Sequence, residues 1–520
     1  MDAVAKSMLE SQHLPGLAVV VVHDGQTIYR GGFGFADVHQ KRVIDPQTTI
    51  FRIGSISKAL TLLTLARQID RGLLARDQDV RKWIDAFTGE IRTPLTIDHL
   101  LTHTSGLDQI GTKRQIRHLH LPFGDRRSLR RGIEKFLRDN NLRQIEQPGR
   151  RYCYDTYGTT LAGFILGRLH EMPYASVMQQ ELFEVLGMQD SAVEVIDEKR
   201  KHLAIGYGYV DGDFIARPYE LYETTPASSI DATPADMGRL MEALTSDGAN
   251  RSGRFLSAKM HAKVISRHFR VHPSFSGVTH GLFESWSSED GTSDVHLRSL
   301  GHGGSMDGYR AALTLIPSER IGIFIVSNRS PDAGGGMIDF RPLVDVVVNS
   351  IEEAPRRMPI SIPPTNGANL QQYVGDYYYS VFCHSLTAQD QGDGAWLRGR
   401  VNPVRVENSA LRVRDELYFP TEEPDLFVQS NGRRMLLFSR DRTGRIDSYT
   451  YSTSPDTFEL TDPNYKTYPS LAQRFYELAS EGQFRNATQV CQQAIRANTH
   501  YIREAEFNNA GYALMRSGRN

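Results

Sequence analysis

Apolar runs of strand length occur at two places far apart in this chain, and the segment between them has helical patterns. The first place begins with Leu17–Val22, which leads through a turn into a hairpin partner. The second place holds Ala311–Ile316 and Ile321–Val326. Between them, residues 95–250 mostly show apolar residues at helical spacing. This order predicts an α/β fold whose terminal strands are neighbours in one sheet, with a helical domain inserted between them.

The rest of the chain changes character at a proline-rich segment. We expect a large first domain over residues 1–352 and a linker over 353–369, which contains four prolines. Short alternating segments with turn signals predict a small all-β, lipocalin-like domain over 370–462. Residues 463–520 show helical spacing and predict a helical tail that resembles one truncated unit of a helical repeat.

Charge and composition exclude several classes of protein. The 60 Lys and Arg residues balance 61 Asp and Glu residues, which argues against a globally basic nucleic-acid binder. No apolar run is long enough to span a bilayer, so no transmembrane segment is expected. Three distant cysteines exclude a disulfide framework and a cysteine-rich metal site. No secretory signal is visible, so we expect a cytoplasmic protein, or a periplasmic or secreted one if a leader was removed.

The segment with the clearest chemistry is Gly54–Lys58, at a predicted boundary between a strand and a helix. Ser55 and Lys58 are three residues apart, so on a helix their side chains lie on one face. A serine in the first helical turn has its backbone N–H at the positive end of the helix dipole. A lysine with a depressed pKa can accept or relay the hydroxyl proton. Taken alone, the pair is explained more simply as an N-cap serine beside a solvated lysine.

Other segments of the chain favour a catalytic interpretation of Ser55 and Lys58. These segments are Gly31–Asp37, Phe51–Gly54, His99–Leu107, Pro148–Gly158, Pro234–Met237 and Leu300–Ser305. With Gly54–Lys58, this set resembles the penicillin-recognising serine hydrolases of the class C β-lactamase type, which include D-aminopeptidases, D-Ala-D-Ala carboxypeptidases and esterases. The resemblance covers about residues 10–350. It implies an antiparallel sheet flanked by helices, as in β-lactamases and transpeptidases.

The resemblance also implies roles for individual residues. Ser55 corresponds to the nucleophile and Lys58 to its partner, while Tyr154 corresponds to the phenol that moves protons between nucleophile and leaving group. The third motif corresponds to His302-Gly303-Gly304. The backbone N–H groups of Ser55 and Ser305 would form an oxyanion hole, with Gly304 beside them. A tyrosine with its ordinary pKa of about 10 is a poor base, so a nearby cation such as Lys58 has to lower it.

Two positions depart from the family pattern. The second motif usually reads Tyr-x-Asn, and here it reads Tyr154-Asp155-Thr156. A threonine hydroxyl has less reach than an asparagine amide for gripping an acyl-side amide of the substrate. His302 stands where many β-lactamases have lysine, and a histidine is mostly neutral at pH 7. The attraction of this position for a substrate carboxylate is therefore weaker than that of a lysine, which disfavours β-lactams.

Together these features predict a serine hydrolase that works through an acyl-enzyme on a small amide or short peptide bond, including bonds of D-amino acids. The alternatives are a carboxylesterase or weak β-lactamase using the same site, and a non-catalytic penicillin-binding-like module. The module would show loss of Ser55, Lys58 or Tyr154, and all three are present. We expect a small-molecule or short-peptide substrate and no cofactor; the sequence does not indicate an oligomeric state.

Two remaining features have plainer interpretations. His99 and His103 are helically spaced, but no third ligand or HExxH pattern accompanies them, so we predict no metal site and a structural role for both. Residues 113–151 hold 12 Lys and Arg against 4 Asp and Glu. The simpler interpretation is a solvated helical face and loop, and the alternative is a positive rim over a cleft that favours anionic substrates.

Overall fold

The computed structural model describes most of the first 351 residues and a second, smaller part of the chain. The described residues are 1–84, 91–107, 132–139, 146–194, 197–272, 275–287, 297–330, 338–351, 369–379, 401–451 with short gaps, and 464–467, together with a few isolated positions. The proline-rich linker and most of the predicted helical tail therefore lie outside the described residues; within the tail, Asn464–Thr467 form a strand and not a helix.

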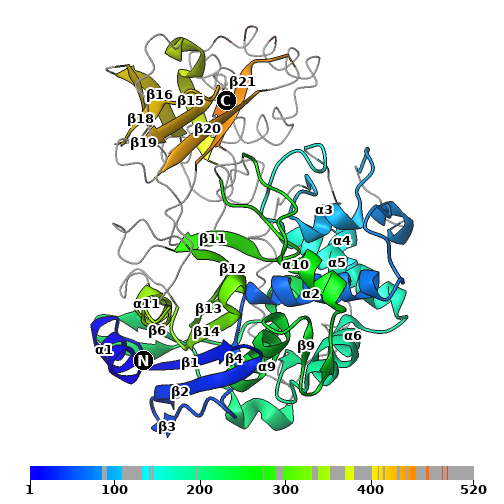
Figure 1. Ribbon diagram of the computed structural model, residues 1–520, viewed down its shortest axis with the longest axis vertical. Coiled ribbons are helices and arrows are strands. Elements are labelled where there is room, and N and C mark those ends of the chain that lie inside the picture. The colour runs from blue at the N-terminus through cyan, green and yellow to red at the C-terminus, as the bar shows by residue number, and fades with distance from the viewer. Residues whose placement is uncertain are drawn as a thin grey trace.

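The centre of the first part is a seven-stranded sheet in the order β11-β12-β13-β14-β1-β2-β3, and its neighbours pair antiparallel. The first strand of the chain, β1, lies between β14 and β2 (Figure 1). The predicted adjacency of terminal strands is confirmed. The strands are β1 (Gly16–His23), β2 (Gln26–Asp37), β3 (Arg42–Val43), β11 (Phe283–Ser287), β12 (Leu297–Met306), β13 (Tyr309–Ile316) and β14 (Ile321–Ser327).

Helices cover both faces of this sheet, which explains why Leu17–Val22 is apolar at every position. Ala18, Val20 and Val22 face the larger core, which the inserted helices complete. Leu17, Val19 and Val21 face a second core under α1 and α11. The helices are α1 (Asp2–Ser11), α2 (Ile56–Asp70), α3 (Ile97–Leu101), α4 (Gly132–Asp139), α5 (Thr156–Leu169), α6 (Tyr174–Met178), α7 (Glu184–Leu186), α8 (Thr225–Ser228), α9 (Pro234–Leu244), α10 (Ala258–Ile265) and α11 (Arg341–Val348).

Short strands join the helical region to the sheet. The pair that matters for the site is β4 and β8, because β4 leads directly into α2. The short strands are β4 (Phe51–Arg52), β5 (Ala192–Val193), β6 (Tyr207–Val210), β7 (Asp213–Ala216), β8 (Ile230–Ala232), β9 (Ala249–Asn250) and β10 (Gly253–Arg254).

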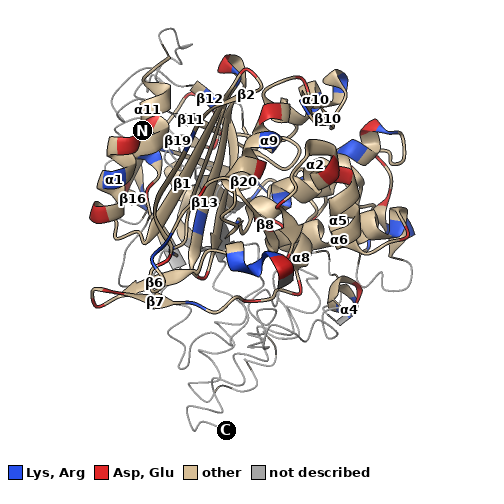
Figure 2. Ribbon diagram, turned by 90° about the horizontal axis from the view of Figure 1, so that it is seen from below, with Lys and Arg blue, Asp and Glu red and all other residues tan. Residues whose placement is uncertain are grey.

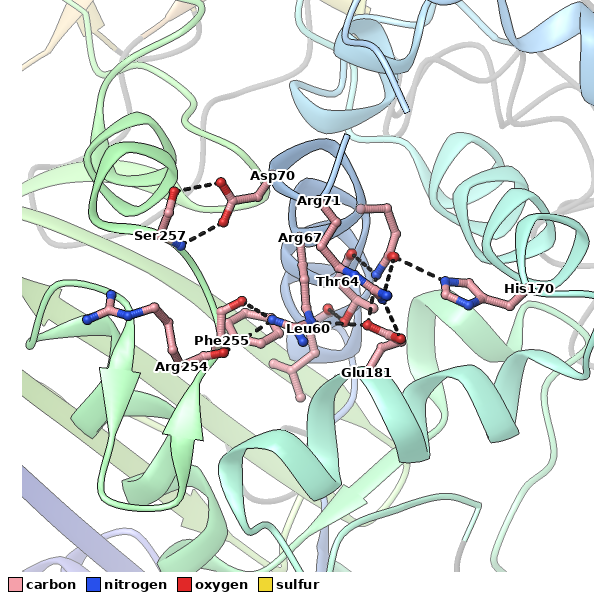
Figure 3. A network of polar contacts seen from close by, with 11 residues as sticks. Leu60, Thr64, Arg67, Asp70, Arg71, His170, Glu181, Arg254, Phe255 and Ser257 are labelled. Atoms are coloured by element: carbon pink, nitrogen blue, oxygen red, sulfur yellow. Dashed lines mark hydrogen bonds and ion pairs between the residues drawn. The ribbon is translucent and has the colours of Figure 1, made fainter. Parts of the chain in front are cut away.

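Helix α2 is held firmly at its C-terminal end (Figure 3). Glu181 accepts hydrogen bonds from Arg67 at 3.1 Å and from Arg71 at 2.6 Å. On the other side of the helix, the Asp70 carboxylate accepts from the backbone N–H and the hydroxyl of Ser257, both at 2.6 Å. Charge-assisted hydrogen bonds of this kind are shorter and stronger than neutral ones. These contacts restrain the helix as a whole, including its N-terminal end, where Ser55 lies.

The second part is a closed antiparallel barrel, in which β15 pairs with both β16 and β22. Aromatic side chains fill its interior, among them Tyr377, Phe427, Phe438 and Tyr449. A separate all-β unit is confirmed. The strands are β15 (Gly375–Tyr379), β16 (Val401–Glu407), β17 (Ala410–Val413), β18 (Glu416–Pro420), β19 (Leu426–Gln429), β20 (Met435–Arg440), β21 (Ile446–Tyr451) and β22 (Asn464–Thr467). The domain division at residues 352, 369 and 462 stays a proposal, and β22 extends beyond the last of these boundaries.

The barrel contacts the first part close to Tyr154. Arg151 donates to the Ser448 hydroxyl at 2.5 Å, and Arg150 donates to the Arg440 carbonyl at 2.9 Å. An apolar cluster joins the two parts as well, with Phe275 packed among the barrel residues Leu426, Val428 and Met435. The segment that precedes Tyr154 is thus attached to the barrel. Cys153, in the same segment, is disulfide-bonded, which uses the one bridge that three cysteines allow.

Charged residues of both signs are interspersed over the described ribbon (Figure 2), in keeping with the net charge of −1. Within the described ranges, no helix combines the length and the apolar character that crossing a membrane requires.

Candidate active site

Ser55 lies at the junction of β4 and α2, as the N-cap residue of the helix. Gly54 before it has φ +55°, a conformation that favours glycine. A Cβ atom on Gly54 would lie 2.9 Å from the backbone nitrogen of Ser305, so the absence of a side chain lets β12 approach the turn. The backbones of residues 54 and 305 are therefore in contact beside the Ser55 hydroxyl.

Lys58 lies on the same face of α2 as Ser55, as the spacing predicted. Its Nζ donates to Ser55 Oγ at 3.2 Å and to the Ala227 carbonyl at 3.0 Å. The simpler interpretation of the pair, a capping serine beside a solvated lysine, is wrong. Lys58 is only 3% exposed, and the side chain of Ser55 makes no capping hydrogen bond. Burial lowers the pKa of Lys58 to about 7, although the Asp155 carboxylate raises it. Near neutral pH a large fraction of this amine is uncharged and able to accept a proton.

Tyr154 completes the group from a different element, the segment that leads into α5. Lys58 Nζ lies 4.7 Å from the centroid of the Tyr154 ring. The side chain of Asp155 caps α5 by accepting from the Gly158 backbone N–H at 2.5 Å, which fixes the start of the helix directly after Tyr154. Tyr154 is half-buried, whereas its neighbours Cys153 and Asp155 are buried.

His302 on β12 is brought to the same group, with its ring centroid 6.0 Å from that of Tyr154. Its Nδ1 lies 2.6 Å from the Gly303 carbonyl, which can only accept, so Nδ1 carries the proton. Burial first, and Lys58 second, lower the pKa of His302 to about 3. The ring is therefore neutral, and its Nε2 is buried with no hydrogen-bond partner among the described residues. This free nitrogen is an acceptor, because the single N–H is used on the Gly303 carbonyl.

Gly304 and Ser305 lie where β12 passes the turn. A Cβ atom on Gly304 would lie 2.0 Å from the Ile53 carbonyl, so this position accepts no side chain. Ser305 is exposed. Thr156 is the first residue of α5 and is half-buried, two positions after Tyr154.

The basic segment 113–151, interpreted as a solvated face or alternatively as a positive rim, is described only in part. Three of its arginines are visible and each forms an ion pair: Arg138 with Glu134 at 2.6 Å, and Arg150 and Arg151 with Glu146 at 3.2 and 3.3 Å. Residues 108–131, which carry many of the remaining basic side chains, lie outside the described residues.

No group of three His, Cys, Asp or Glu side chains suited to a metal ion occurs among the described residues. His99 is structural, as predicted, because its Nδ1 accepts from the Thr96 backbone N–H in the capping box of α3.

The comparison with protein families decides the classification. The family model described as Beta-lactamase matches residues 1–346, which include every residue of the group above. The chain belongs to the Beta-lactamase family. The resemblance drawn from the sequence motifs is confirmed, and the matched range ends before the barrel begins.

Known relatives of this family member are distant in sequence. "Penicillin-binding protein 4*" of Bacillus subtilis (strain 168) is 24% identical over 439 residues, which are 81% of this chain and 90% of that protein. "Protein flp" of Staphylococcus aureus (strain N315) is 24% identical over 335 residues, 63% of this chain and 62% of that protein.

Solved structures show the same fold. The octameric penicillin-binding protein homologue from Pyrococcus abyssi covers 90% of this chain and 99% of its own, with a TM-score of 0.55 at 19% identity. A class C β-lactamase from Rhodobacter sphaeroides covers 67% of this chain and 98% of its own, with a TM-score of 0.53 at 22% identity. EstCE1, a hydrolase with promiscuous acyltransferase activity, covers 67% of this chain and 97% of its own, with a TM-score of 0.55 at 20% identity.

Two residues of the site were missed by the sequence analysis of this Beta-lactamase family member. His103 was interpreted as structural together with His99, but its ring centroid lies 5.4 Å from that of Tyr154. Phe283 on β11 lies 4.9 Å from His302 and 6.0 Å from Tyr154, centroid to centroid. The segment His103-Thr104-Ser105-Gly106 offered a signal for the first, since it resembles the histidine motif. Nothing local marks Phe283.

Proposed function

We propose that this chain is a serine hydrolase that forms an acyl-enzyme on Ser55 with a small amide, short peptide or ester substrate. The observation that carries the proposal is the contact between Lys58 Nζ and Ser55 Oγ at 3.2 Å, made by a buried amine whose pKa is lowered to about 7. A nucleophile beside a base that is uncharged near neutral pH is the arrangement that activated serine hydrolysis requires.

The proposed steps follow from the positions of the three side chains. Ser55 Oγ attacks the substrate carbonyl carbon, and its proton passes to Lys58. The carbonyl oxygen becomes an oxyanion, for which the backbone N–H groups of Ser55 and Ser305 are the proposed donors. As the scissile bond breaks, Tyr154 relays a proton to the leaving nitrogen or oxygen. Water then attacks the acyl-enzyme along the reverse proton path and releases the acid and free Ser55.

The substrate class is best argued from His302. Its neutral ring supplies no positive charge to a substrate carboxylate, and its free nitrogen is an acceptor, which a carboxylate does not favour. A charge-assisted hydrogen bond contributes about 1.5–3 kcal/mol, on the order of tenfold to a hundredfold in rate constant. Small amides, including D-aminoacyl amides, are therefore the first choice, and esters that lack a carboxylate are the alternative.

The first test is a substrate panel of D-aminoacyl amides, neutral nitrophenyl esters and nitrocefin, with Ser55→Ala as the blank. We expect the amides or the esters to exceed nitrocefin in kcat/KM, and a fluorophosphonate to label Ser55. Faster turnover of nitrocefin would contradict the argument from His302. A wild-type protein that neither turns over any of these substrates nor accepts the fluorophosphonate would instead support a non-catalytic module.

The second test is the pH dependence of acylation. The pKa of Lys58 is lowered to about 7, so the amine loses its proton as the pH rises through that value. Since the uncharged form accepts the serine proton, the rate of fluorophosphonate labelling should increase through about pH 7 and then level off. A profile that keeps rising toward 10.5, the ordinary lysine value, would contradict a base with a lowered pKa, because a lysine of ordinary pKa gives that profile.

A further inference from the structure

His103, which lies just after α3, contacts both the ring of Tyr154 and the backbone on either side of it. His103 is completely buried and has φ +54°, an uncommon backbone conformation for a residue with a side chain. Its ring faces that of Tyr154 at 5.4 Å between centroids, with 31° between the ring planes. Phe283 packs against the same imidazole at 5.6 Å.

His103 binds the backbone on both sides of Tyr154. The Cys153 N–H donates to the His103 carbonyl at 2.8 Å, and the Asp155 N–H donates to His103 Nδ1 at 3.1 Å. These two hydrogen bonds tie the Tyr152–Cys153 peptide group and the Tyr154–Asp155 peptide group to a single residue. The backbone is therefore restrained on both sides of Tyr154, and the phenol ring packs against the same imidazole.

The neighbouring residues of the loop reinforce this arrangement. The Ser105 hydroxyl donates to the Asp155 carboxylate, the same carboxylate that caps α5 through Gly158. The Gly149 N–H donates to the Thr104 carbonyl at 2.8 Å. Residues 103–105 therefore form hydrogen bonds along the whole segment that carries Tyr154, from residue 149 to residue 155.

The side chain of His103 can act this way only with an unprotonated Nδ1. Burial, with His302 and Lys58 as further causes, lowers the pKa of His103 well below its ordinary value. The imidazole is neutral, and its single proton is on Nε2, because Nδ1 accepts the Asp155 N–H.

We infer that His103 is a positioning residue for the reaction: its carbonyl and Nδ1 bind the backbone N–H groups of Cys153 and Asp155, on either side of Tyr154, and so hold the phenol beside Lys58. The inference rests on the proposed function, in which Tyr154 relays protons. His103 itself acts through Tyr154 and is not assigned contact with the substrate.

The test compares variants that separate the acceptor from the ring. His103→Phe keeps the ring and loses the acceptor, whereas His103→Asn keeps an oxygen acceptor near the position of Nδ1 and tolerates a positive φ. We expect His103→Phe to lower kcat for a neutral nitrophenyl ester by about tenfold to a hundredfold with little change in KM, since small misplacements of reacting groups have effects of this size. His103→Asn should recover most of the loss.

His99→Phe is the matched control, because His99 Nδ1 also accepts a backbone N–H at 3.1 Å, within the same segment but in the cap of α3. It should lower the melting temperature without lowering kcat of the folded enzyme. If His103→Phe does not fold, His103→Gly replaces it, because glycine suits φ +54° and also removes the acceptor.

A double-mutant cycle with Tyr154→Phe provides the decisive readout. A residue that acts through Tyr154 should have no further effect once the phenol hydroxyl is gone. The same loss in both backgrounds, or a His103→Asn variant as impaired as His103→Phe, would overturn the inference. Wild-type acylation by Tyr154→Phe alone would instead overturn the proposed role of Tyr154, so the two failures are distinguishable.

Discussion

Replacement of Ser55 by alanine is expected to abolish turnover, with the largest loss of any single substitution in this chain. In the proposed mechanism the Ser55 hydroxyl attacks the substrate, and loss of the nucleophile in another serine hydrolase costs on the order of 10⁶ in kcat. The fold should be unaffected, since among the described residues the hydroxyl bonds to Lys58 alone, at 3.2 Å. The measurements are kcat on the preferred ester or amide, fluorophosphonate labelling and the melting temperature.

Ser57→Ala is the control for this prediction, because it removes a serine hydroxyl from the same helix without removing the proposed nucleophile. The Ser57 hydroxyl is completely buried and accepts the Ile230 N–H at 3.0 Å, so its loss leaves a buried donor without a partner. Such a loss costs about 1–3 kcal/mol of the free energy of unfolding. Ser57→Ala should therefore lower the melting temperature and keep the labelling of the folded enzyme. Equal losses of labelling in the two variants would contradict the assignment of Ser55.

The second large effect is expected for Tyr154→Phe. This change removes the phenol hydroxyl and keeps the ring that contacts Lys58, His103 and His302. General acid–base groups contribute about 10²–10⁴-fold to a rate, and both the acylation step and the release of the leaving group use this hydroxyl in the proposed mechanism. Single-turnover acylation with a nitrophenyl ester should fall by that range, while the melting temperature stays near the wild-type value.

Tyr152→Phe is the matched control, because Tyr152 lies on the same segment and its ring also packs edge-on against His103 and Phe283. We expect it to acylate at close to the wild-type rate. If Tyr154→Phe acylates as fast as wild type, another group relays the proton and the correspondence of the second motif is wrong.

The parts of the site that the sequence could predict are those that depend on local geometry. Ser55 and Lys58 share one helical turn, so their spacing alone indicates that the side chains meet. Tyr154 and His302 come from distant segments, and only the resemblance to a known family associated them with Ser55. The strands Leu17–Val22 and Ile321–Val326 were predictable for the same local reason, because each is a short continuous apolar run.

What could not be predicted depends on contacts between distant residues. The role inferred for His103 rests on a positive φ and on two hydrogen bonds to a segment about fifty residues later, neither of which has a sequence pattern. The protonated nitrogen of His302 is set by its own neighbour, the Gly303 carbonyl, and composition does not reveal that. The last barrel strand, Asn464–Thr467, lies beyond the proposed end of the all-β domain at residue 462. It is short and polar, and it joins the barrel by pairing with β15.

The attachment of the barrel to the segment before Tyr154 has a consequence for how this protein can be altered or diversify. Arg151 reaches the barrel at Ser448, and only Tyr152 and Cys153 separate that anchor from Tyr154. The two parts are therefore not interchangeable modules. A barrel transplanted from a relative has to bring a hydroxyl or carbonyl that fits Arg150 and Arg151, or the host has to change both arginines along with it. Ser448 therefore belongs in any directed-evolution library aimed at turnover, because its buried hydroxyl accepts from Arg151, whereas Arg440 contributes a backbone carbonyl that every residue has.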